Sequence, residues 1–115
     1  MIIGIVAGVL TVVMIEVIDS RFKVDDPVGA VAVHGVCGIF GTIAIGLFAK
    51  NGGLFTTGHL ERLGIQLIGI LVIVVWTSVV SGIILLIIKK TVGLRVSAEA
   101  EIKGLDWSEH GIPYD

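Results

Sequence analysis

The stretch PVGAVAVHGVCGIFGTIAIGLF, residues 27–48, carries a single histidine, His34, in an otherwise apolar run. Its 22 residues would extend about 33 Å as an α-helix, enough to cross a hydrocarbon layer about 30 Å thick. An ionisable group at that depth is costly, and such groups usually face the interior of a helix bundle or a pathway. The stretch therefore predicts a membrane helix whose histidine has a function.

Two further apolar segments lie on either side of this stretch. The earlier one would reach only about 25 Å and is marginal as a span, whereas the later one would reach about 39 Å and can cross with tilt. Of the 115 residues, 55% are hydrophobic and only 16% are charged, so much of the chain must be solvated by lipid. We predict an all-α polytopic membrane protein with three transmembrane helices, at about 2–18, 27–48 and 63–88, within a membrane region 1–90 that precedes a polar tail, 91–115.

The ends of the segments indicate how the chain is oriented. Asp26 followed by Pro27 is typical of a helix start, with the carboxylate as the cap and proline at the first helical position. Six of the eight Lys and Arg residues lie in the 19–26 connection or after Ile88, and the positive-inside rule assigns both parts to the cytoplasm. The apolar start at residue 2, without a charged leader, suggests the C-terminal piece of a longer protein.

Two glycines lie close to His34 on the predicted helix. At about 100° per residue, Gly38 and Gly41 fall within about 40° of His34. This face leaves space beside the imidazole, or it lets another helix approach closely. One interpretation is a histidine that lines a narrow path, and the other is a histidine that hydrogen-bonds to a neighbouring helix. A neutral imidazole suits a path for a small polar solute because it offers one donor and one acceptor.

The sequence favours neither an enzyme nor a nucleic-acid-binding protein. It contains no glycine-rich phosphate loop, no spacing typical of metal ligands and no Ser/His/Asp set, so we expect no catalytic residues, metal or cofactor. The net charge of −2 and the lack of a basic stripe indicate no nucleic-acid partner. The lone cysteine, Cys37, lies in an apolar run and indicates nothing about the redox compartment.

Three strings resemble consecutive parts of the ammonium transporter family. DDPVGAVAVHGVCGIFGTIAIGLF (25–48) resembles its penultimate membrane helix, residues 64–97 resemble its last helix and exit, and EAEIKGLDWSEHGIPYD (99–115) resembles its cytoplasmic tail. The resemblance implies an eleven-helix bundle in the cell (plasma) membrane, a homotrimer with one pore per subunit, and a tail that can meet a PII-type signal protein.

The resemblance also implies a role for His34, which matches the second of two hydrogen-bonded histidines in the ammonia pore. The first histidine and the gating phenylalanines belong to earlier helices. Some members carry an acid where this chain has Gly29, so the resemblance assigns that position no substrate role.

The expected function is therefore ammonium or ammonia transport, with His34 lining the pore and Gly38 and Gly41 beside it. The alternative is a non-transporting subunit or truncated fragment that packs on partner helices and docks a regulatory protein through its tail. A proton-relay subunit of a redox complex is a weaker alternative, because it calls for more intramembrane acids than Glu16.

Overall fold

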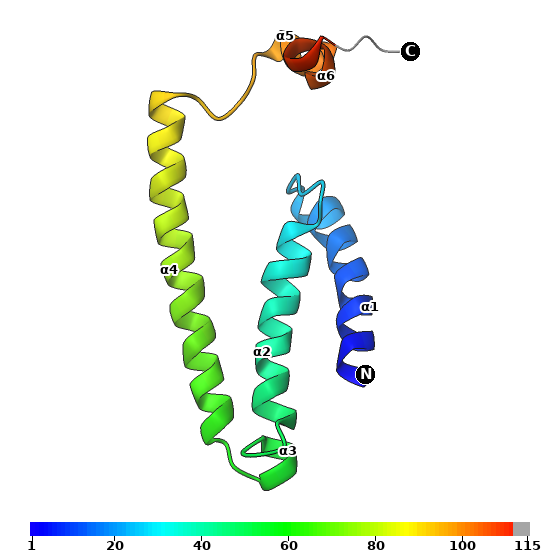
Figure 1. The fold of residues 1–115 in the computed structure, drawn as a ribbon, viewed down its shortest axis with the longest axis vertical. Coiled ribbons are helices and arrows are strands. Elements are labelled where there is room, and N and C mark those ends of the chain that lie inside the picture. Colours follow the sequence, from blue (N-terminus) through cyan, green and yellow to red (C-terminus); the bar gives the residue numbers. More distant parts are fainter. Residues whose placement is uncertain (112–115) are drawn as a thin grey trace. The chain divides into compact units, whose positions relative to one another are not determined.

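A computed structural model describes residues 1–111, with side chains for all of them except 106–108. All regular secondary structure within this range is helical, and Figure 1 shows its order along the chain. The elements are α1 (Ile2–Val17), η1 (Ile18–Phe22), η2 (Val31–Val36), α2 (Cys37–Phe48), α3 (Leu54–Thr57), α4 (Glu61–Thr91), α5 (Ala98–Lys103) and α6 (Leu105–His110), where η marks a π-helix.

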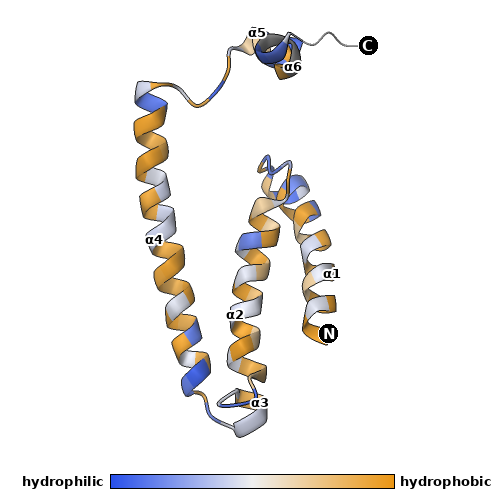
Figure 2. Ribbon diagram, viewed as in Figure 1, coloured by the Kyte–Doolittle hydropathy of each residue, from blue (hydrophilic) through white to orange (hydrophobic). Residues whose placement is uncertain are grey.

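Three continuous helical spans in the described part of the chain are long and apolar enough to cross a membrane. They are Ile2–Phe22, Val31–Phe48 and Glu61–Thr91. Figure 2 shows hydrophobic colour along most of these spans and hydrophilic colour near the connections. The prediction of an all-helical chain with three membrane helices is confirmed.

The first span is longer than the sequence predicted. Its α-helix continues without a break into η1, so helix geometry persists to Phe22 instead of ending near residue 18. Its 21 residues reach about 31 Å, and the added turn carries the charged residues Asp19 and Arg21. The helix ends at Lys23, whose left-handed φ of 52° lets the next backbone N–H, that of Val24, donate to the Ile18 carbonyl at 3.2 Å.

The second span begins later than predicted, at Val31 instead of Pro27. Pro27 is not the first helical residue, because Pro27 and Val28 form a turn in which the Gly29 N–H donates to the Asp26 carbonyl at 3.0 Å. Gly29 then takes a φ of +66°, a left-handed conformation that cannot continue a right-handed helix. The third span, in contrast, extends beyond its predicted bounds of 63–88 to include charged residues at both ends.

The chain divides into two compact units, Met1–Val74 and Val75–Asp115. In the first unit, α1 packs against η2 and α2 in antiparallel fashion. Ile3 near the start of α1 lines the same hollow as Phe48 at the end of α2, whereas Ile15 near the end of α1 lies against Gly29. These two contacts set the register of the pair.

Small residues allow the close approaches in this unit. Ala32 and Ala44 are buried, and a Cβ added at Gly46 would lie 2.9 Å from the Cα of Leu63 at the start of α4. Small side chains are typical of contacts between membrane helices, where backbones gain dispersion energy by approaching closely. Most large apolar side chains stay exposed, and none is buried in the most apolar window of α4.

The connection between α2 and α4 is more ordered than a glycine-rich loop would suggest. It contains the single turn α3, and the rings of Phe48 and Phe55 stack with centroids 5.4 Å apart. The Thr56 hydroxyl donates to the Ala49 carbonyl at 2.6 Å. These contacts tie the connection to the end of α2.

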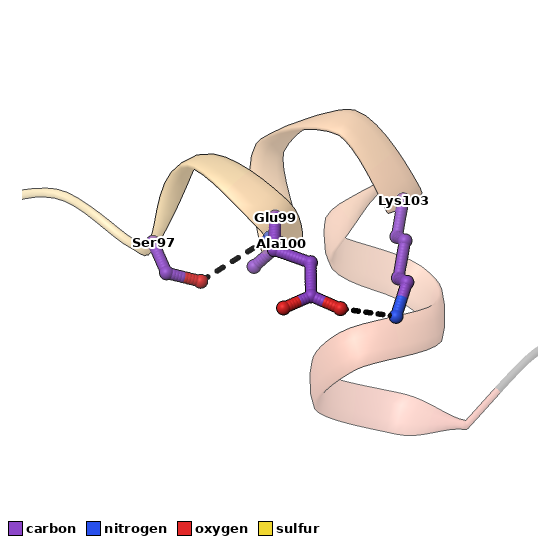
Figure 3. A network of polar contacts seen from close by, with 4 residues as sticks. All are labelled: Ser97, Glu99, Ala100 and Lys103. Carbon is purple, nitrogen blue, oxygen red and sulfur yellow. Dashed lines mark hydrogen bonds and ion pairs between the residues drawn. The ribbon is translucent and has the colours of Figure 1, made fainter.

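In the second unit, the tail forms two short helices after the end of α4. Figure 3 shows the Ser97 side chain accepting a hydrogen bond from the Ala100 N–H at 3.2 Å, and the Lys103 ammonium contacting the Glu99 carboxylate at 2.6 Å. Exposed pairs of this kind stabilise a helix by only a few tenths of a kcal/mol. The last residues of the predicted tail, 112–115, lie outside the described residues.

Candidate functional site

His34 lies in the π-helix η2, not in a regular α-helix as the sequence predicted. The backbone N–H of Cys37 donates to the Ala32 carbonyl, five residues earlier, and His34 is within the turn that this bond closes. π-Turns are rare, and they occur frequently at functional sites. The angle of about 40° between His34 and the glycines assumed regular α-helix, so it does not hold across this turn.

The imidazole of His34 projects away from the packed face of its helix. Ala32 has no exposed surface and Cys37 is half-buried, whereas His34 is exposed. Among the described residues, none makes a hydrogen bond with the His34 side chain. The π-helix η2 packs on α1, with Cys37 in contact with it, and the exposed histidine is available to groups outside this helix pair.

The two glycines predicted beside His34 are open. A Cβ added at Gly38 or Gly41 would have no atom within 4 Å apart from the neighbouring backbone of its own helix. Gly41 lines a shallow apolar hollow of about 250 Å³ together with Ile3 and Phe48, and His34 is not part of that lining. Space thus exists along this helix, while the structure does not join His34 and Gly41 in one cavity.

Asp26 binds the start of the second span through both carboxylate oxygens. Oδ1 accepts from the Ala30 N–H and Oδ2 accepts from the Val31 N–H, each at 2.8 Å. The carboxylate therefore satisfies two backbone donors that would otherwise lack partners at a helix start, and its charge opposes the positive end of the helix dipole.

A polar contact between α1 and the His34 helix was not predicted. Thr11 Oγ1 and Cys37 Sγ lie 3.0 Å apart, and the Thr11 hydroxyl also donates to the Ala7 carbonyl at 2.9 Å. The sequence does contain a signal for such a contact, because Thr11 is the one hydroxyl-bearing residue between positions 2 and 18. Which helix it faces depends on the interhelical register, which the local pattern does not contain.

Known proteins similar to this chain are ammonium transporters. The sequence model for the Ammonium Transporter Family matches residues 1–113. Ammonium transporter 1 member 1 of Solanum lycopersicum is 38% identical over 122 residues, covering 94% of this chain and 25% of that protein. Ammonium transporter Amt1 of Haloferax mediterranei is 37% identical over 112 residues, covering 97% and 21%. The ammonium transporter of Aquifex aeolicus is 35% identical over 113 residues, covering 95% and 26%.

The matches cover nearly all of this chain but only part of each relative. The chain spans about a quarter of the length of these curated relatives. No solved structure matches it significantly. Because the family model extends over residues 1–113 and the three spans have the expected helical character, the chain belongs to the ammonium transporter family.

Proposed function

We propose that this chain forms part of an ammonium transporter and that His34 lines the path taken by the substrate. The observation that carries the proposal is an exposed imidazole, without a hydrogen-bond partner in residues 1–111, on a π-turn of a membrane helix. Membership of the ammonium transporter family supports ammonium as the substrate class. A role in transport also accounts for the cost of keeping a histidine at membrane depth.

The chemistry of the imidazole suits passage of ammonia. Ammonium carries a charge that an apolar path disfavours, so the neutral molecule crosses more cheaply once its proton has been left behind. Ammonia has one lone pair and three N–H groups, which match the donor and acceptor nitrogens of a neutral imidazole. His34 would hold ammonia transiently, and exchange between its tautomers offers a route for a proton.

The proposal includes further helices that complete the path. In the three spans, only 6%, 17% and 0% of the most apolar windows is buried, so these helices alone do not enclose a channel. We expect assembly as a homotrimer in the plasma membrane, with the tail in the cytoplasm and able to meet a PII-type signal protein. On this proposal the protein transports its substrate and catalyses no reaction.

A non-transporting subunit is the second candidate. The observation that favours it is α4, whose 31 residues contain no buried side chain and therefore present a long surface for partner helices. Such a subunit would co-purify with a separate membrane chain and leave ammonium uptake unchanged when it is removed.

Substitution of His34 separates these functions. The natural protein that carries this chain is expressed in cells without other ammonium uptake, and entry of radiolabelled methylammonium is measured at equal abundance in the membrane. His34→Asp should alter the rate or the selectivity of uptake. His59→Asp is the matched control, because His59 is exposed in the connection before α4. Uptake that is the same in both variants and in the wild type would refute the role of His34.

A further inference from the structure

The contact between Thr11 and Cys37 belongs to a small polar cluster on α1. The hydroxyl of Thr11 lies 2.9 Å from the Ala7 carbonyl and can donate to it. Across the 3.0 Å to Cys37 Sγ, either the thiol donates to Thr11 Oγ1 or the hydroxyl donates to the sulfur, and both arrangements join the two side chains. Cys37 Sγ is also 3.5 Å from the Ala7 carbonyl, so the thiol faces two acceptors on α1 and Thr11 is the nearer one.

This contact holds one end of the π-turn that contains His34. The N–H of Cys37 closes the turn on the Ala32 carbonyl, and Ala32 at the other end is fully buried. A π-turn contains one residue more than an α-turn. Conversion to α-helical register would shift the helix before the turn by one residue, about 100° of rotation relative to α2. The direction of the imidazole therefore depends on the position of Cys37.

We propose that Thr11 is a positioning residue for His34: its hydroxyl holds the Cys37 thiol against α1 and thereby keeps His34 in the π-turn. The inference rests on the proposed function of His34 and adds the residue on which its orientation depends. Hydrogen bonds between membrane helices contribute modestly, and this is enough to favour one of two helix registers.

Matched variants separate the hydroxyl from the volume of the side chain. In the natural protein, Thr11→Val keeps the branched shape and removes the hydroxyl, whereas Thr11→Ser keeps the hydroxyl. Polar contacts between membrane helices are modest, so we expect Thr11→Val to lower maximal uptake by on the order of threefold. Its abundance in the membrane should be unchanged, and Thr11→Ser should retain near-normal uptake.

Two spectroscopic measurements report positioning without transport. The S–H stretching band of Cys37, identified by subtracting the spectrum of Cys37→Ser, should move in Thr11→Val and stay in place in Thr11→Ser. The side-chain NMR resonances of His34, identified by their absence in His34→Asp, should move in Thr11→Val. If Thr11→Val does not accumulate, Cys37→Ala removes the same bond from the other helix and should move the same resonances.

The outcomes distinguish this inference from the proposed function. A shifted S–H band with unmoved His34 resonances and normal uptake would overturn the positioning role while the function of His34 stands. Moved His34 resonances together with reduced uptake support it. Uptake unaffected by His34→Asp would refute the proposed function, and the NMR resonances would still decide whether Thr11 positions the imidazole.

Discussion

Replacing Gly29 by alanine tests how the turn before the second membrane span holds that span against α1. Gly29 has a φ of +66°, and a Cβ built there would lie 2.9 Å from Ile15 Cδ1 and 3.0 Å from Ile15 Cγ1. The substitution therefore introduces two separate costs, one conformational and one steric. Both act at the point where the antiparallel register of α1 and the second span is set.

The two costs can be estimated from the geometry. The left-handed conformation costs a residue with a Cβ about 1–2 kcal/mol. The Ile15 side chain must turn away from the new methyl group, and an off-rotamer side chain costs about 0.5–1.5 kcal/mol. We expect Gly29→Ala to lower the free energy of unfolding by about 1.5–3.5 kcal/mol.

A double-mutant cycle with Ile15→Val assigns these costs. Valine lacks Cδ1, the nearer of the two contacting atoms, so the double variant should recover part of the steric cost and none of the conformational one. Unfolding of the natural protein in mixed micelles, followed by circular dichroism, supplies the four free energies. If Gly29→Ala is as stable as the wild type, the left-handed turn is wrong. If Ile15→Val recovers nothing, the contact between the two residues is wrong.

Two other substitutions test packing and the helix start. Gly46→Ala places a Cβ 2.9 Å from the Leu63 Cα. Overpacking costs about 1–3 kcal/mol and the gain in helix propensity offsets about 1 kcal/mol, so the same unfolding measurement should show a lower stability. Gly69→Ala is the control, because a Cβ there meets open space and should cause no loss of stability. Asp26→Ala removes both acceptors at the start of the second span and should lower the free energy of unfolding by about 0.5–2 kcal/mol, with Asp26→Asn intermediate. Hydrogen exchange of the Ala30 and Val31 amides should become faster, and unchanged exchange would contradict the capping role.

Much of the fold could be predicted because membrane helices satisfy their own backbone. Lipid offers no hydrogen bonds, so apolar runs of the length found at residues 2–18, 27–48 and 63–88 have helix as their stable spanning structure. The ends were less predictable. Asp26-Pro27 is typical of a helix start, yet Gly29 has a left-handed φ that cannot continue a right-handed helix, and the span starts at Val31.

The candidate site shows the same division. A histidine in an apolar run is visible in the sequence as an anomaly of composition, and the nearby glycines indicated open space that the structure also has. The π-turn around His34 was not visible, since its neighbouring residues are compatible with α-helix as well. Whether His34 lines the path stays a prediction, for the uptake experiment to decide.

By itself, the sequence determined that the chain is a helical membrane protein, resembles ammonium transporters and carries His34 in an apolar run, because these properties depend on composition and short patterns. Only the tertiary structure decided where the second span begins, that His34 lies in a π-turn, and that Thr11 meets Cys37. These features depend on the register between two helices, which is set by contacts between residues far apart in the chain. Thr11 and Cys37 are separated by 26 positions, and packing alone brings them to 3.0 Å.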